Sequence, residues 1–177
     1  GRAGVLVVSR GPGLSNALIG LHTAYHDATP LVVFIGQVER FEAGRLALQE
    51  QNYSKLLSDV TKAVIEVNDP VQASEAVARA FHIAESGTPG PVAIIIPEDV
   101  FDTETDAPLN RPRPPALAGP MPDDLAVLAD RLAKAERPLI WVGPTMRENG
   151  LGELKELAEK WVLPVSPTHR RPHLFDA

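Results

Sequence analysis

The sequence has no cysteine among its 177 residues, and aromatic side chains make up only 5% of it. The missing thiols exclude disulfides and thiolate sites for metals or redox chemistry. Because aromatic rings are scarce, the core must be built from Val, Leu, Ile and Ala, within the 44% of residues that are hydrophobic. No apolar run approaches the ~18 residues that a membrane-spanning helix needs. We therefore expect an aliphatic core and no membrane partner.

Excess positive charge is also missing. The chain has 17 Lys and Arg against 23 Asp and Glu, which gives a net charge of -6. This balance argues against a broad nucleic-acid surface. The sequence has neither a signal peptide nor an initiator methionine. We therefore expect a cytoplasmic fragment of a longer protein.

Short apolar runs alternate with helical patterns along the first half of the chain. The runs are rich in β-branched residues and show little alternation, which is typical of strands buried on both faces of a parallel sheet. One helical pattern covers Leu14 to Tyr25, and a second begins at Asp69 as N-cap and ends at Gly87. The alternation predicts an α/β fold with a doubly wound, mostly parallel sheet and flanking helices. The apolar runs span residues 5–8, 31–35, 63–67 and 91–96.

A proline-rich segment divides the chain. Residues 108–122 hold six prolines, which predicts an extended, semi-rigid linker. We assign residues 1–107 to one domain that lacks its first part. Residues 123–177 are assigned to the truncated start of a second α/β, Rossmann-like domain. The elements predicted there are a helix over 123–135, a strand over 138–143, a helix over 152–161 and a strand over 163–165.

A glycine-rich segment, Gly11-Pro12-Gly13, follows the first predicted strand, where α/β proteins often hold phosphates or polar cofactors. A Walker A loop would need a Gly-Lys-Ser/Thr ending, which is absent. A dinucleotide fingerprint would need a third glycine where Asn16 stands and an acidic residue after the next strand, which ends in Gly36-Gln37-Val38. The first interpretation is excluded and the second disfavoured. A tight turn with Asn16 as N-cap of the helix stays open.

A series of motifs runs in a fixed order through the first hundred residues. The series resembles the pyrimidine-binding domain of thiamine-diphosphate enzymes, in particular the acetolactate synthase and pyruvate oxidase group. The linker and the second α/β segment are then similar to the start of that family's middle domain. The motifs include Gly4–Val8, Gly11-Pro12-Gly13, Asn16, Thr23-Ala24-Tyr25, Gly36-Gln37-Val38, Gln49-Glu50, Gly90-Pro91-Val92 and Ile96-Pro97.

The resemblance implies a 2-oxo acid decarboxylase or carboligase that uses thiamine diphosphate with Mg²⁺. In such enzymes the diphosphate-binding domain of an identical subunit completes the site, so a homodimer or tetramer is expected. Ser9, Pro12 and Asn16 would lie beside the aminopyrimidine, with the neighbouring glycines leaving room for the ring. Gln49 would face the reactive carbon region and orient a substrate carbonyl. A solvated loop glutamine is the alternative for Gln49.

Several positions bear on the substrate and on a second cofactor. Val38 matches a substrate-pocket position, with a core or loop valine as the alternative. Leu48 stands where acetolactate synthases usually have Phe, and Glu98 where they usually have Lys. These changes remove an aromatic face and reverse a charge that suits an anionic 2-oxo acid, so a less anionic substrate fits as well. FAD binding is unsupported, because Gly143 is followed by Pro144 rather than by further glycines.

Parts of the family's chemistry have no counterpart in the chain. The resemblance puts the catalytic Glu upstream of Gly1 and the Gly-Asp-Gly…Asn metal and diphosphate motif beyond Ala177. We expect no metal site here, since His22 and His26, one helical turn apart, lack a third ligand. The chain alone is expected to be inactive. The alternative function is a noncatalytic nucleotide- or ligand-binding α/β module.

Overall fold

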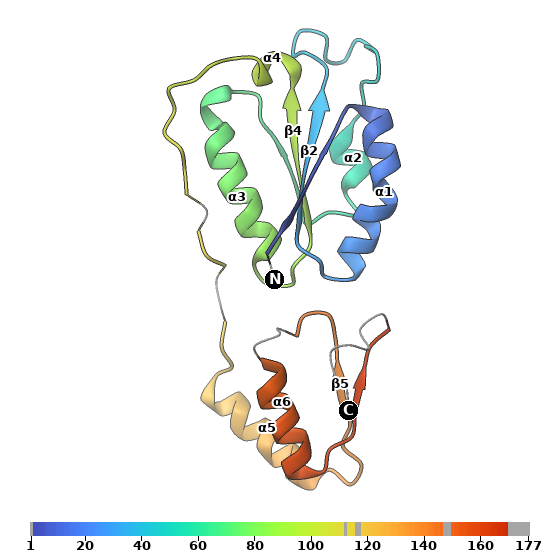
Figure 1. The fold of residues 1–177 in the computed structure, drawn as a ribbon, viewed down its shortest axis with the longest axis vertical. Coiled ribbons are helices and arrows are strands. Elements are labelled where there is room, and N and C mark those ends of the chain that lie inside the picture. Colours follow the sequence, from blue (N-terminus) through green and yellow to red (C-terminus); the bar gives the residue numbers. More distant parts are fainter. Residues whose placement is uncertain (1, 112, 116–117, 147–149, 170–177) are drawn as a thin grey trace. The chain divides into compact units, whose positions relative to one another are not determined.

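A computed structural model of the protein describes residues 2–111, 113–115, 118–146 and 150–169. The chain forms two compact units, Gly1–Ala116 and Leu117–Ala177, each of which is described by itself. The first unit contains a four-stranded parallel sheet in the order β1-β2-β4-β3. Figure 1 shows the sheet between its helices. The strands are β1 (Gly4–Val8), β2 (Leu31–Gln37), β3 (Ala63–Glu66) and β4 (Pro91–Pro97).

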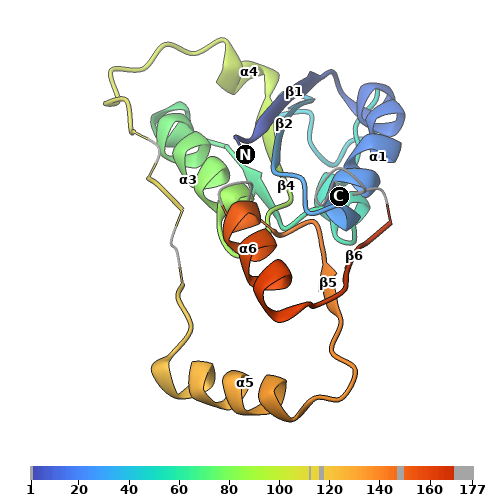
Figure 2. The same cartoon turned by 60° about the horizontal axis from the view of Figure 1, so that its bottom comes forward.

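Helices cover both faces of this sheet. Helices α1 (Gly11–His26) and α2 (Tyr53–Leu57) lie on one face and α3 (Ala73–Glu85) on the other (Figures 1 and 2). Successive strand residues point to opposite faces of the sheet. Ile94 packs in a core cluster with Ala80 of α3, whereas Ile95 packs in a second cluster with Leu14 of α1 and Leu57 of α2. The predicted doubly wound α/β fold is therefore confirmed.

The first strand differs from the prediction of burial on both faces. Side chains of Val5 and Val7 are 59% and 73% exposed. Strand β1 lies at an edge of the described sheet, and α3 packs on β2, β3 and β4 instead. Burial on both faces is wrong for this strand because a helix reaches only one of them.

The boundaries of α3 follow the predicted signals. Asp69 is the N-cap of a short 3₁₀ turn, η1 (Pro70–Gln72), which leads into α3. The backbone N–H of Val71 donates to Asp69 Oδ1 at 2.9 Å. After the helix, Gly87 takes a φ of 59°, a conformation that favours glycine. The helical segment therefore begins after the predicted Asp69 cap and ends before the predicted glycine. Its first turn is 3₁₀, however, and α3 itself has Gln72 as N-cap without a side-chain hydrogen bond.

The glycine-rich segment is helical. Helix α1 begins at Gly11, so Gly11-Pro12-Gly13 forms its first turn, and Arg10 stands at the N-cap. Proline suits this first turn because its φ is already helical and its missing N–H is not needed there. Asn16 lies one turn further along, so the interpretation of Asn16 as the helix cap is wrong. The turn between β1 and α1 consists of Ser9 and Arg10 alone.

The second unit also combines helices with parallel strands. Strands β5 and β6 pair in parallel, with Ile140 opposite Val165. The predicted order of helix, strand, helix and strand is confirmed, with β6 beginning two residues later than expected. Among the described helices of the whole chain, none is long and apolar enough to cross a membrane. The elements are α5 (Pro122–Lys134), β5 (Ile140–Val142), α6 (Leu151–Trp161) and β6 (Val165–Pro167).

Candidate functional site

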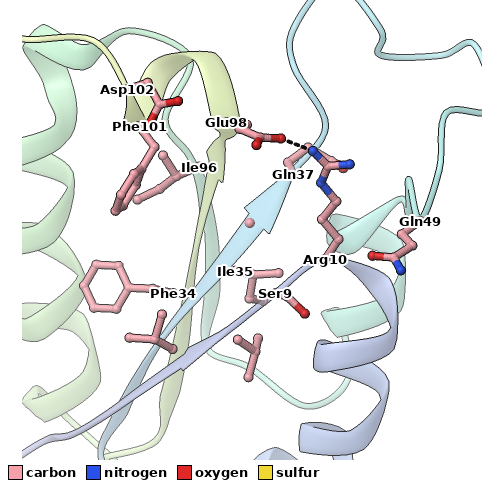
Figure 3. Close-up of a pocket in the computed structure, with 13 residues that line it drawn as sticks. Ser9, Arg10, Phe34, Ile35, Gln37, Gln49, Ile96, Glu98, Phe101 and Asp102 are labelled. Atoms are coloured by element: carbon pink, nitrogen blue, oxygen red, sulfur yellow. Dashed lines mark hydrogen bonds and ion pairs between the residues drawn. The ribbon is translucent and has the colours of Figure 1, made fainter.

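A pocket of about 450 Å³ lies at the carboxyl ends of β1, β2 and β4 in the first unit (Figure 3). This edge is where open α/β sheets bind ligands. Apolar side chains line the inner part, and polar or charged side chains come from the strand ends and the loops. The lining residues are Val7, Val8, Ser9, Arg10, Phe34, Ile35, Gly36, Gln37, Gln49, Ile96, Glu98, Phe101 and Asp102.

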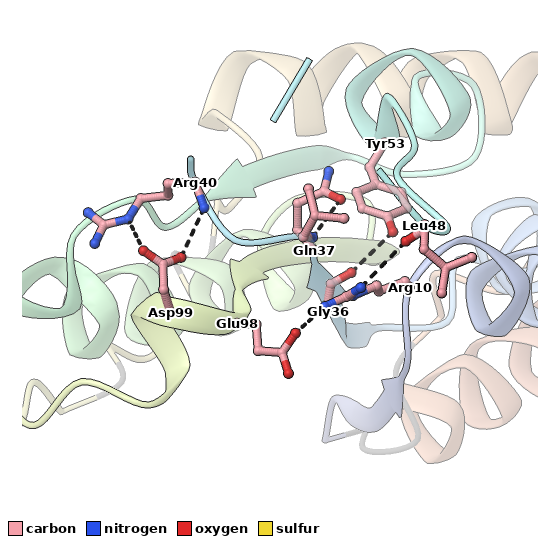
Figure 4. A network of polar contacts seen from close by, with 9 residues as sticks. Arg10, Gly36, Gln37, Arg40, Leu48, Tyr53, Glu98 and Asp99 are labelled. Atoms are coloured by element: carbon pink, nitrogen blue, oxygen red, sulfur yellow. Dashed lines mark hydrogen bonds and ion pairs between the residues drawn. The ribbon is translucent and has the colours of Figure 1, made fainter. Parts of the chain in front are cut away.

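An ion pair closes one side of the pocket. Arg10 follows β1, and Glu98 opens the short helix α4 (Glu98–Phe101) directly after β4. Arg10 Nη2 donates to Glu98 Oε2, and Arg10 Nη1 donates to the Leu48 carbonyl oxygen at 3.4 Å (Figures 3 and 4). The negative charge of Glu98 is therefore paired with the positive charge of the Arg10 guanidinium.

Gln49 reaches the pocket from the loop between β2 and α2. Its φ is 64°, in the left-handed region. The Gln49 carbonyl oxygen accepts a hydrogen bond from the Gly11 N–H at 3.3 Å, which ties the loop to the start of α1. The side chain is exposed at the pocket rim (Figure 3). Its amide is thus available to a bound molecule.

The next residue, Glu50, folds this loop onto itself. Glu50 Oε1 accepts from the Gly44 N–H at 2.6 Å, and Oε2 accepts from the Ala47 N–H at 3.1 Å. The Gly44 N–H, aided by those of Ala47 and Leu46, holds the pKa of the Glu50 carboxyl below its usual value, although desolvation opposes the shift. The ionised carboxylate therefore fixes the loop that presents Gln49.

Replacing Glu50 with glutamine is expected to make the free energy of unfolding fall less steeply as the pH is lowered from 7 into the acid range. Because the folded-state pKa of Glu50 is lowered, its contribution to the free energy of unfolding is present above the unfolded-state pKa. It is lost as the pH falls through the folded-state pKa. Urea midpoints of Glu50→Gln and the parent chain should therefore differ at pH 7 and converge in acid. A difference that stays constant with pH would contradict this role.

A second contact fastens the start of the same loop. Arg40 Nε donates to Asp99 Oδ2 at 2.6 Å, and the Arg40 N–H donates to Asp99 Oδ1 at 3.1 Å (Figure 4). Desolvation raises the pKa of the Asp99 carboxyl, but hydrogen bonds and charge from Arg40 outweigh it and leave the pKa below its usual value. The loop is thus held at both ends, by Asp99 on α4 and by Gly11 on α1.

The two glycines of the first α1 turn allow close packing within the chain. A Cβ atom on Gly11 would lie 2.8 Å from Gln51 Cγ and 3.1 Å from the Gln49 carbonyl oxygen. A Cβ on Gly13 would lie 2.7 Å from Ser9 Oγ. The family resemblance implied that the saved space would admit a cofactor ring. In the structure the Gln49 loop and Ser9 take it up.

The pocket brings together three of the residues singled out from the sequence, Ser9, Gln49 and Glu98. Four others do not line it. Pro12 and Asn16 are exposed on α1, and Leu48 is 77% exposed, with its carbonyl oxygen rather than its side chain turned to Arg10. Val38 is fully buried, which supports the core alternative for that valine.

Sequence reasoning assigned no role to several residues of the pocket, among them Arg10, Gln37, Phe101 and Asp102. One signal could have found them, since each lies at or shortly after the end of a predicted strand. Parallel strands bring their carboxyl ends to one edge, so such residues gather there. Phe34 and Phe101 give the pocket aromatic walls, and Gln37 and Gln49 give it neutral amides. This set fits a flat heterocycle with a polar edge.

A metal site would need several ligating side chains close together. Within the described ranges, no group of three or more His, Cys, Asp or Glu could hold a metal ion. The rings of His22 and His26 lie 4.6 Å apart between centroids on α1. Neither histidine lines the pocket.

Comparison with known proteins places the chain beside one group of enzymes. Residues 1–57 match the family described as thiamine pyrophosphate enzyme, N-terminal TPP binding domain. The acetolactate synthase large subunit of Lactococcus lactis is 32% identical over 95% of the chain and 30% of the relative. That of Parasynechococcus marenigrum is 35% identical over 99% of the chain and 30% of the relative. A probable acetolactate synthase large subunit of Methanocaldococcus jannaschii is 35% identical over 95% and 30%. The chain thus spans about a third of the length of these relatives.

Proposed function

We propose that this chain, which is similar to acetolactate synthase large subunits and matches the thiamine pyrophosphate enzyme family over residues 1–57, forms the aminopyrimidine side of the cofactor site in a 2-oxo acid carboligase. The observation that carries this proposal is the pocket at the strand ends. It joins the aromatic walls of Phe34 and Phe101 to the hydroxyl of Ser9 and the amide of Gln49. A flat ring with hydrogen-bonding edges fits such a set.

The proposed reaction joins a 2-oxo acid to a carbonyl acceptor. The bond between the carboxylate and the oxo carbon of the donor breaks, and carbon dioxide leaves. The former oxo carbon bonds to the carbonyl carbon of the acceptor, whose oxygen takes up one proton. The product is a hydroxy ketone. Thiamine diphosphate, when bound, supplies the nucleophilic carbon that this exchange of bonds requires.

Each residue of this chain has a limited role in that reaction. Ser9 and the two phenylalanines would hold the ring in place. Gln49 would donate its amide N–H to the oxygen of the reacting carbonyl, where negative charge develops. We further propose that Mg²⁺ and the diphosphate are held by another domain, supplied by an identical subunit. FAD remains without support from the residues of this chain.

The test is cofactor dependence in the full-length protein. With pyruvate as donor, we expect carbon dioxide release and hydroxy ketone formation only when thiamine diphosphate and Mg²⁺ are both added. The 177-residue chain alone is expected to form no product. Carboligation by the chain alone would contradict the proposal. Full-length protein that binds a nucleotide or another ligand but releases no carbon dioxide would favour a noncatalytic module.

A further inference from the structure

Three charged side chains line the pocket in the part of the chain that the structure describes. They are the guanidinium of Arg10 and the carboxylates of Glu98 and Asp102. At neutral pH one negative charge therefore remains over the pair formed by Arg10 and Glu98. This balance disfavours a carboxylate that stays on the bound molecule, as that of an anionic acceptor does, whereas the carboxylate of the donor leaves as carbon dioxide.

The guanidinium of Arg10 is already engaged. It donates to Glu98 and to the Leu48 carbonyl oxygen, and its side chain is only 24% exposed. A carboxylate arriving from solvent would have to share this cation with Glu98 or displace it. Charge-assisted hydrogen bonds with a carboxylate are among the stronger ones in proteins. The one cation of the described lining is thus neutralised before a substrate arrives.

The remaining polar groups of the lining are neutral. Gln37, Gln49 and Ser9 offer amide and hydroxyl groups that hydrogen-bond a carbonyl oxygen without requiring charge. The amide of Gln37 is engaged at both ends, since its Nε2 donates to the Gln51 carbonyl oxygen at 3.0 Å and its Oε1 accepts from the Val38 N–H at 3.0 Å. Phe101 is 76% exposed and gives the mouth of the pocket an apolar wall. The polar groups that the pocket leaves for a substrate beside the ring are therefore uncharged.

We propose that the acceptor substrate is an uncharged aldehyde or ketone, selected over a second 2-oxo acid by the Arg10–Glu98 pair. This inference rests on the proposed carboligase function and narrows its substrate class. Glu98 acts as a specificity-determining residue because it occupies the cation that an anionic acceptor would need. Removing the charge of Glu98 should therefore release Arg10 and admit the anionic acceptor.

The experiment uses full-length protein with thiamine diphosphate, Mg²⁺ and ¹³C-labelled pyruvate as donor. Propanal and 2-oxobutyrate, which differ by one carboxylate, compete as acceptors at equal concentration. The ratio of their two products is measured by NMR. The parent protein should favour propanal, and Glu98→Gln should shift the product ratio toward 2-oxobutyrate by about tenfold or more. The double variant Glu98→Gln with Arg10→Met should lose that shift. Glu75→Gln, an exposed residue on α3 outside the pocket lining, is the matched charge control.

A binding measurement separates this inference from the proposed function. In calorimetric titration of cofactor-free full-length protein with 2-oxobutyrate, Glu98→Gln should bind about tenfold more tightly than the parent. If neither acceptor gives product, the carboligase proposal fails and the titration alone decides the charge preference. The inference would be overturned if the parent protein preferred 2-oxobutyrate to propanal. It would also be overturned if the product ratio and the affinity for 2-oxobutyrate differed by less than twofold between Glu98→Gln and the parent.

Discussion

Replacing Gln49 with alanine in the full-length protein is expected to lower kcat for carboligation about 10²- to 10³-fold. Gln49 brings a neutral amide to the rim of the pocket. An amide N–H stabilises an oxyanion most when the charge develops, so its loss should lower kcat and kcat/KM together. Steady-state rates of product formation with pyruvate as donor give both constants.

A control is needed for the backbone conformation of Gln49, because a substitution there can change the backbone as well as remove the amide. Its φ of 64° lies in the left-handed region, which glycine adopts without strain and asparagine with less strain than other residues. Gln49→Gly removes the amide and relieves this strain, whereas Gln49→Ala removes the amide and keeps it. Both should lose kcat to the same extent. Gln72→Ala, an exposed glutamine in η1, should keep the parent rate. An active Gln49→Gly would show that the backbone, not the amide, matters.

Much of the fold could be predicted because local patterns determine it. The β-branched runs form strands, and the Asp69 cap and Gly87 bound the segment made of η1 and α3. The exposure of Val5 and Val7 could not be predicted in this way, since an apolar run does not tell which helix reaches its outer face. The start of α1 was missed because glycine suggested a loop, whereas Pro12 suits a first helical turn.

The site was less predictable than the fold, for a physical reason. Arg10 and Glu98 are 88 positions apart, and only the parallel order of β1, β2 and β4 brings them together. Glu98 taken alone indicates a reversed charge. Paired with Arg10, it indicates a neutralised cation, which leads to a different expectation for the acceptor. Strand order, which short sequence patterns do not determine, therefore changes the chemistry inferred from Glu98.

Replacing Leu14 with alanine is expected to lower the free energy of unfolding by about 3 to 4 kcal/mol. Leu14 is fully buried in the cluster that packs α1 and α2 against the sheet, which also contains Ile35, Tyr53 and Leu57. Removing its outer carbons loses their burial and leaves a cavity that these neighbours only partly fill. Urea unfolding of the purified 177-residue chain, followed by circular dichroism, measures the change.

Ile19 provides the matched control for Leu14 because it lies on the same helix but is 82% exposed. Ile19→Ala should change the free energy of unfolding by no more than about 0.5 kcal/mol. Leu14→Met, which nearly conserves volume, should recover most of the loss. If Leu14→Ala and Ile19→Ala cost the same, α1 would not be packed on the sheet. The Gly11 contact to Gln49 would then lack its support, because the first turn of α1 holds Arg10 and the Gln49 loop at the pocket.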